Sequence, residues 1–253
     1  MSELLLMGLP ASMSASLEQV AEIRQPLMLL TRHSIREQAL GDGFAGYALP
    51  LTEQGRQLAQ AWGAALLQQT GRRLHSCISS PIQRCLETAS LMRAGQAQLL
   101  GIAVETLPPI EQQLLLVEPG GFVYDVAQAG PLFFKHGSLA FINAFLRQEV
   151  PGMKVPQHGV CDLLQLLHQQ SVATTLESAA DTLHLAVSHD TILAAFLAVM
   201  AQQREITWAD WPEMMEGVWL WFEGETFLAA TVHWLWRGVH YRQSVQSLTE
   251  MKA

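Results

Sequence analysis

The apolar run Leu27-Met28-Leu29-Leu30 is followed directly by Thr31-Arg32-His33-Ser34-Ile35-Arg36. An apolar run that ends in a polar cluster predicts a buried strand whose last residues reach the edge of a sheet, where open α/β folds bind ligands. The side chains placed there are the guanidiniums of Arg32 and Arg36 and the imidazole of His33. Two permanent cations beside a potential nucleophile suit an anion with several oxygens, and phosphate is the commonest such substrate in cells.

The arginines also act on the imidazole itself. Because a neighbouring positive charge disfavours the imidazolium, it lowers the pKa of His33 and keeps the ring neutral and nucleophilic near pH 7. The alternative interpretation is that Arg32 and Arg36 are ordinary surface residues and that His33 only ends a strand.

Two further apolar runs end in polar residues of the same kind. Residues 75–80 predict a strand, after which Ser80 is expected to cap a helix that has Pro81 at its first position. Arg84 then lies one turn inside this helix, so its side chain and the helix N-terminus can both face one anion. Residues 184–188 predict another strand, which ends in Ser188-His189-Asp190 and adds a second imidazole and a carboxylate.

The patterns Arg-His-x-x-Arg, Ser-Ser-Pro-x-x-Arg and Ser-His-Asp at three strand ends resemble the histidine phosphatase superfamily, which also contains the cofactor-dependent phosphoglycerate mutases. The resemblance extends to Leu51-Thr52-Glu53-Gln54-Gly55, which opens a helix after the first loop, and to Thr88-Ala89 after Arg84. Asp190-Thr191-Ile192-Leu193 and the later Trp211-Pro212 look like the acid-phosphatase branch. The similarity covers about residues 27–93 and 184–237.

The residues and the resemblance together predict a phosphatase that hydrolyses a phosphomonoester in two steps. His33 attacks phosphorus to give a phosphohistidine, which water then resolves. The phosphate oxygens are expected to be held by Arg32, Arg36, Arg84 and His189, where positioned donors stabilise the developing charge.

The acid that protonates the leaving group has two candidates. Asp190 is the first, and it needs a raised pKa to hold a proton near neutral pH. In the mutase-like branch the corresponding acid is a glutamate after the third strand, which makes Glu111 the second candidate.

One departure from the family pattern lies inside the site. Family members usually have glycine after the nucleophilic histidine, whereas this chain has Ser34, whose side chain is expected to narrow the approach of phosphate and to be able to donate a hydrogen bond to it. A catalytically idle phosphate-binding member of the fold, and a phosphomutase, therefore stay open as alternatives to the phosphatase.

A metallohydrolase is a further alternative, with His33, His189, Asp190 and Glu111 as ligands. The arginines of the same pocket would repel a divalent cation, and no His-x-x-x-His or similar ligand pair is present. No metal and no cofactor are therefore expected.

Composition limits the partners. The 253 residues are 49% hydrophobic and 15% charged, which predicts a single folded domain over residues 1–253. A net charge of −8 argues against nucleic acid and anionic membranes as partners and leaves a small phosphorylated substrate or a phosphoprotein. The three cysteines have no metal-ligand spacing, and neither a secretion signal nor an apolar run of spanning length is recognisable, so the cytoplasm is the expected location.

The alternation of apolar segments predicts an α/β fold with three layers, α/β/α, around a mostly parallel sheet. Expected strands are 27–31, 75–79, 103–107 and 184–188, followed by a C-terminal antiparallel hairpin of 217–222 and 226–233. Expected helices are 52–69, 81–93 and 190–202. The glycine-rich segment 41–46 lacks the spacing of a phosphate-binding loop and is interpreted as a loop beside the pocket.

Residues 110–180 are expected to form a small helical insertion with helices at 137–148 and 159–170. Placed between the third and fourth strands, the insertion would lie over the strand ends as a substrate-facing cap, with Phe133-Phe134-Lys135-His136 as the first residues to consider. The other interpretation is an ordinary crossover elaborated by helices.

Overall fold

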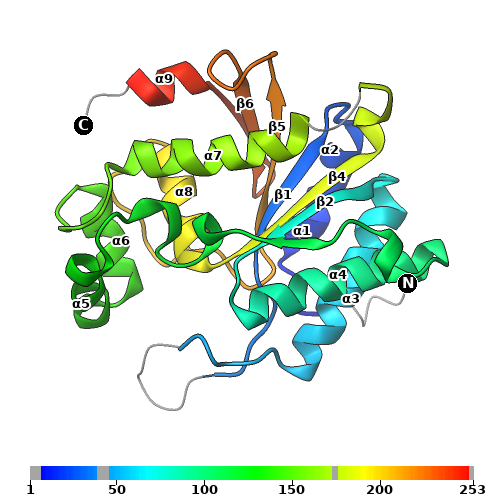
Figure 1. Ribbon diagram of the computed structural model, residues 1–253, viewed down its shortest axis with the longest axis horizontal. Helices are drawn as coiled ribbons and strands as arrows, with labels where there is room; N and C mark the ends of the chain where they lie inside the picture. Colours follow the sequence, from blue (N-terminus) through cyan, green and yellow to red (C-terminus); the bar gives the residue numbers. More distant parts are fainter. Residues whose placement is uncertain (1–6, 39–45, 173–175, 251–253) are drawn as a thin grey trace.

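The computed structural model describes residues 7–38, 46–172 and 176–250 of the chain (Figure 1). Within these residues, seven strands form one sheet in the order β3-β2-β4-β1-β5-β6-β7. The strands β3, β2, β4 and β1 are parallel, whereas β5, β6 and β7 are antiparallel. Their bounds are β1 Leu27–Arg32, β2 Arg73–Ser79, β3 Ile110–Gln112, β4 Thr182–Ser188, β5 Gly217–Glu223, β6 Thr231–Trp236 and β7 Val239–Ser244.

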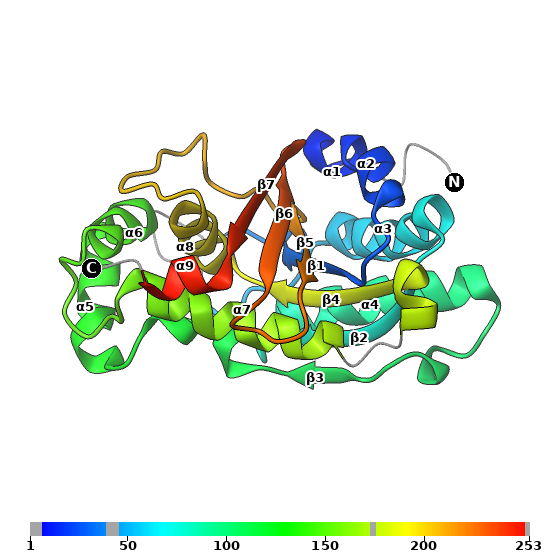
Figure 2. The ribbon, with the colours of Figure 1, turned by 90° about the horizontal axis from the view of Figure 1, so that it is seen from above.

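Both faces of the sheet are covered, as expected for three layers. Successive residues of a strand point to opposite faces, so Leu27 and Leu29 of β1 join one buried cluster and Met28 and Leu30 join the other. The first cluster includes residues of α1 (Ala11–Ala15), α2 (Leu17–Glu22), α3 (Glu53–Thr70) and α4 (Gln83–Leu100). The second includes residues of α7 (Pro156–Val172), α8 (Asp190–Met200) and α9 (Val245–Glu250). In Figure 2, α1, α2 and α3 lie together on one side of the sheet.

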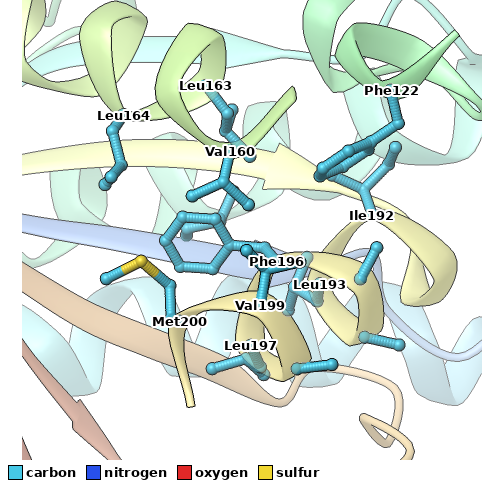
Figure 3. Close-up of a cluster of buried hydrophobic side chains, with 14 of the residues drawn as sticks. Phe122, Val160, Leu163, Leu164, Ile192, Leu193, Phe196, Leu197, Val199 and Met200 are labelled. Atoms are coloured by element: carbon cyan, nitrogen blue, oxygen red, sulfur yellow. The ribbon is translucent and has the colours of Figure 1, made fainter. Parts of the chain in front are cut away.

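The second cluster is dense around α8, because this helix is buried along almost its whole length. Phe196 and Met200 of α8 pack against Val160 and Leu164 of α7 (Figure 3). A helix that is apolar all round belongs in the interior, and α8 is therefore a rigid support for the residues at its N-terminal end.

The insertion between β3 and β4 has two parts. Helices α5 (Val126–His136) and α6 (Ser138–Leu146) lie beyond the carboxyl end of β4, whereas α7 packs on the sheet against β1, β4 and β5 (Figures 1 and 2). Only α5, α6 and their adjoining loops can therefore act as a cap. Helix α5 was not expected, because Gly130 and Pro131 favour a turn, yet the chain keeps Pro131 inside the helix.

The prediction of a strand at 103–107 is wrong. Residues Val104–Thr106 form a short 3-10 helix, and the third strand begins only at Ile110. Pro108 and Pro109 have no N–H group to donate to a ladder, which delays pairing with β2 until after them. The segment that follows the third strand therefore starts later in the sequence than expected.

The C-terminal hairpin is present, but its second strand starts later than predicted and a third strand follows it. Its second strand runs from Thr231 to Trp236 rather than over 226–233, and β7 adds a third strand. Arg237 and Gly238 both have positive φ, 48° and 79°, which is the signature of a two-residue type I′ turn. In the part of the chain that the structure describes, no helix has the length and apolar character needed to cross a membrane.

Candidate active site

His33 follows the last residue of β1 and is 2% exposed. Its backbone N–H donates to the carbonyl of Ser188 at the end of the neighbouring β4, over 3.0 Å. The ring nitrogen Nδ1 lies 2.8 Å from the carbonyl oxygen of Ser34. Because a carbonyl only accepts, Nδ1 carries the proton and Nε2 keeps its lone pair.

Arg84 lies in the first turn of α4 and bridges the two histidines. Its Nε donates to Nε2 of His33 over 2.9 Å, and its Nη2 donates to Nδ1 of His189 over 3.2 Å. The two rings pack edge to face with centroids 5.7 Å apart. The expected convergence of the first, second and fourth strand ends on one site is therefore observed.

Ser80 does not cap the helix, contrary to the prediction. Helix α4 begins at Gln83 with Ile82 as its N-cap, and no side chain caps it. The hydroxyl of Ser80 instead lies 2.9 Å from Nε2 of His189. Since Arg84 donates to Nδ1 of His189, Nε2 must carry the proton and donate to Ser80, so this serine sets the tautomer of the second imidazole.

Both imidazoles are held neutral. Burial, followed by the charges of Arg32 and Arg84, holds the pKa of His33 well below its ordinary value. Burial and the charge of Arg84 lower the pKa of His189 to about 3. A neutral imidazole with an unprotonated Nε2 can act as a nucleophile at neutral pH, and Nε2 of His33 is unprotonated and accepts the hydrogen bond from Arg84.

Arg32 is engaged by the loop before β5 and by α8. Its Nη2 forms an ion pair with Asp190 at 2.6 Å, and its Nη1 donates to the carbonyl of Pro212 over 2.8 Å. Its Nε is buried and has no acceptor among the described residues. A phosphate oxygen would satisfy this donor.

Asp190 does not have the raised pKa that an acid needs. Burial acts to raise its pKa, but the ion pair with Arg32 and a 3.3 Å hydrogen bond from the indole of Trp211 lower it below its ordinary value. The backbone N–H of Thr191 donates to its other oxygen over 3.0 Å. Asp190 is thus an ionised partner that orients Arg32.

A carboxyl group with a raised pKa is present at Glu118, which sequence reasoning missed. Burial, followed by the charge of Asp190, raises its pKa to about 7. The hydroxyl of Thr191 donates to its Oε1 over 2.6 Å. The signal that points to Glu118 is its place in the segment after the third strand. The third strand was predicted at 103–107, whereas it lies at Ile110–Gln112, so the glutamate chosen was Glu111. Glu111 lies instead within β3 and is exposed.

Ser34 does not face the site as expected. It is fully buried, and its hydroxyl donates over 2.7 Å to the carbonyl of Gly55 in the first turn of α3. A Cβ at Gly55 would lie 2.1 Å from the carbonyl oxygen of Ile35, so the glycine allows α3 to approach this closely. The Ser34 hydroxyl proton is therefore committed to α3 and not to phosphate.

Arg36 is half-buried at the margin of the cluster. Burial and the charges of Arg32 and Arg84 lower its pKa, which shows that it lies within their field. Its Nη1 donates to the carbonyl of Glu37 over 2.9 Å. In the glycine-rich segment, residues 41–45 lie outside the described residues, and the carbonyl of Gly46 accepts from Nη1 of Arg84 over 3.3 Å.

The described residues contain no group of three or more His, Cys, Asp or Glu side chains placed to hold a metal ion. They do bring together guanidinium groups, two neutral imidazoles and one carboxyl group with a raised pKa. This set can bind a polyanion, attack it and protonate a departing oxygen.

The comparisons with known proteins agree with this geometry. Residues 28–109 match the model of the histidine phosphatase superfamily, branch 1, and this stretch contains His33 and Arg84. The match is to branch 1, although the C-terminal motifs look like the acid-phosphatase branch. No curated protein matches the sequence significantly.

Solved structures share the fold at low identity. The structure titled mycobacterial hydrolase 2 aligns with a TM-score of 0.55 and 15% sequence identity. The alignment covers 91% of this chain and 99% of the hydrolase chain. A phosphoglycerate mutase from Bacillus anthracis aligns with a TM-score of 0.51 and 14% sequence identity. The alignment covers 91% of this chain and 98% of the mutase chain. A mycobacterial glucosyl-3-phosphoglycerate phosphatase aligns with a TM-score of 0.50 and 14% sequence identity. The alignment covers 85% of this chain and 100% of the phosphatase chain.

Proposed function

The chain resembles the histidine phosphatase superfamily both in the sequence of residues 28–109 and in fold, and from this premise we propose that it hydrolyses a phosphomonoester through a phosphohistidine on His33. The observation that carries the proposal is the unprotonated Nε2 of His33, which lies 2.9 Å from Nε of Arg84. A nucleophilic nitrogen next to a permanent cation brings the attacking lone pair and the phosphate charge to one place.

In the first step, the Nε2 lone pair forms the N–P bond while the P–O bond to the leaving group breaks. Glu118 is our candidate for the acid, because its pKa of about 7 leaves a proton to give to the departing alkoxide at neutral pH. In the second step, water attacks phosphorus, the N–P bond breaks, and the Glu118 carboxylate takes the proton from water.

Arg32, Arg36, Arg84 and His189 are proposed to hold the non-bridging oxygens. A phosphate there accepts the N–H groups that Arg84 now directs at the two histidines. Asp190 acts on the phosphate only through Arg32, which it holds by the 2.6 Å ion pair. We therefore transfer the role of the acid from Asp190 to Glu118.

The test of the nucleophile is His33→Ala. We expect this variant to lose phosphatase activity by about 10³-fold or more while it stays folded, because no other step can begin without the N–P bond. His158→Ala is the matched control, since His158 is exposed on α7. Wild type mixed with labelled substrate and quenched during turnover should carry base-stable, acid-labile phosphate, and His33→Ala should carry none.

Substantial turnover by folded His33→Ala would overturn the assignment. The alternatives have their own outcomes in the same experiment. A phosphomutase would move the label to a second hydroxyl group instead of releasing phosphate, and a catalytically idle member would bind phosphate without any labelled intermediate.

A further inference from the structure

A cavity of about 250 Å³ adjoins the candidate acid on the side of the cap. It lies between α5, α6 and α8, and its wall is mainly apolar, with aromatic side chains from Phe122, Phe133, Phe134, Phe141 and Phe145. Two pairs of these rings are packed edge to face, with centroids 5.2 Å and 5.5 Å apart. The wall is therefore a built structure rather than a gap between loops.

The cavity reaches the candidate acid and the N-terminal turn of α8. Glu118 and Thr191 both line it, and Thr191 follows Asp190 directly in α8. Ile192, which follows Thr191, and Ala195, one turn of α8 further on, also line it. Phe122 and Ile192 lie against each other in Figure 3, at the end of the core nearest to this cavity.

Resting on the proposed function, we propose that this cavity receives the leaving group of the substrate, and that the substrate is the phosphomonoester of an apolar alcohol or phenol. An apolar cavity of roughly 150 Å³ binds benzene, so 250 Å³ has room for a ring or an alkyl chain. The phosphate stays with the arginines while the apolar group enters between α5 and α8.

The polar atoms at the mouth do not favour a sugar. The hydroxyl of Thr191 donates to the Glu118 carboxylate, and the hydroxyl of Tyr47 donates to the Glu118 carbonyl over 2.8 Å. The hydroxyl groups of a sugar would lose water on entering an aromatic wall and would find few partners there. An apolar group gains free energy from the same transfer.

An apolar leaving group also suits the proposed acid. Burial, followed by the charge of Asp190, raises the pKa of Glu118 to about 7, so this carboxyl group can carry a proton near neutral pH. An alkyl alcohol is a poor leaving group and requires this proton. The cavity and the acid therefore favour the same class of substrate.

The first experiment compares ethyl, butyl and hexyl phosphate with glycerol phosphate on the wild-type protein. Each added methylene that enters the cavity should raise kcat/KM by about fourfold. Hexyl phosphate should exceed glycerol phosphate by about 10²-fold or more. A flat series, or a preference for glycerol phosphate, would overturn the assignment of the cavity.

The second experiment uses a pair of aromatic residues of the insertion. Phe134 lines the cavity and Tyr124 does not, yet both side chains are 69% exposed, so neither change is expected to unfold the protein. Phe134→Ala should lower kcat/KM for hexyl phosphate by about three- to tenfold and flatten the chain-length series. Tyr124→Ala should leave the series unchanged, and an equal loss in both variants would contradict the proposal.

Alkylphosphonates separate this proposal from the proposed hydrolysis, because their C–P bond is not cleaved by it. Their affinity, measured by calorimetry, should rise with chain length. Rising affinity without turnover of any phosphate ester would overturn the hydrolysis but support the cavity assignment. Turnover with affinity independent of chain length would overturn the cavity assignment alone.

Discussion

The two histidines of the site are both neutral but carry their protons on different nitrogens. The carbonyl of Ser34 fixes the proton of His33 on Nδ1, whereas Ser80 and Arg84 fix that of His189 on Nε2. The two carboxyl groups also differ in protonation. Asp190 forms a 2.6 Å ion pair with Arg32, which lowers its pKa, whereas Glu118 forms no such ion pair among the described residues and its pKa is raised. These neighbours are the basis of the roles that we propose for the four residues: His33 as nucleophile, His189 as phosphate ligand, Asp190 as the carboxylate that orients Arg32, and Glu118 as acid.

At this scale we predict that Glu118→Gln selectively impairs substrates with poor leaving groups. Alkyl phosphates should be slowed about 10²- to 10⁴-fold, whereas p-nitrophenyl phosphate, whose phenolate hardly needs a proton, should be slowed by less than about tenfold. In the wild type, kcat for alkyl phosphates should fall as the pH rises through about 7, since Glu118 then loses its proton. This alkaline limb should be absent from Glu118→Gln.

Asp190→Asn is the matched control for this prediction. Because it leaves the Arg32 guanidinium without its carboxylate, it should slow both substrates by a similar factor at pH values below the alkaline limb. The limb itself should remain but move to lower pH, since the charge of Asp190 helps to raise the pKa of Glu118. A selective loss on alkyl phosphates below the limb in Asp190→Asn would return the role of the acid to Asp190.

At the scale of the elements, the site depends on how closely α3 and α4 approach each other. A Cβ at Gly63 of α3 would lie 2.0 Å from the carbonyl oxygen of Met92, and a Cβ at Gly95 of α4 would lie 1.9 Å from that of Gln60. The two helices thus cross at glycines on both sides. This contact holds α4, whose first turn carries Arg84.

Gly63→Ala should therefore destabilise the protein even though alanine favours helices. The methyl group meets a backbone carbonyl that cannot rotate away, and such overpacking costs about 1–3 kcal/mol or more of unfolding free energy. Urea titration followed by tryptophan fluorescence measures this loss. The surface change Gln68→Ala in the same helix should stay within about 0.5 kcal/mol. Equal stability of Gly63→Ala and wild type would show that the helices can separate without cost.

At the scale of the whole molecule, the cationic site is enclosed by a chain of net charge −8, so its positive field is local. The interior also holds histidines that are neutral because they are buried. The pKa of His184, lowered mainly by burial, is about 3, as is that of His189, and that of His33 is also well below the ordinary value. Burial of neutral histidines links the folding of the whole domain to pH.

We predict that the unfolding free energy falls as the pH is lowered from about 6.5 to about 4.5. In this window the unfolded chain protonates the three histidines and the folded protein does not, which costs about 1.4 kcal/mol per pH unit for each. Glu118 acts in the opposite direction, because its raised pKa makes the folded state take up a proton first. The net slope should be roughly 3 kcal/mol per pH unit.

Urea unfolding at a series of pH values measures the slope. His184→Gln has one titrating group fewer and should show about half of it. A free energy of unfolding that does not change between these pH values would contradict the burial of neutral imidazoles in the folded state.

The sequence by itself determined where β2 and β4 end, where β1 ends to within one residue, and which residues follow the three strands. Apolar runs and the polar residues after them are local patterns, so they were sufficient to predict the three layers and to place His33, Arg84 and His189 at one edge of the sheet. Only the tertiary structure decided which group each side chain meets. Ser34 turns to α3, Asp190 pairs with Arg32, and Glu118 lies partly buried beside an apolar cavity. These outcomes depend on burial and on contacts between segments far apart in the chain, and no local spacing records them.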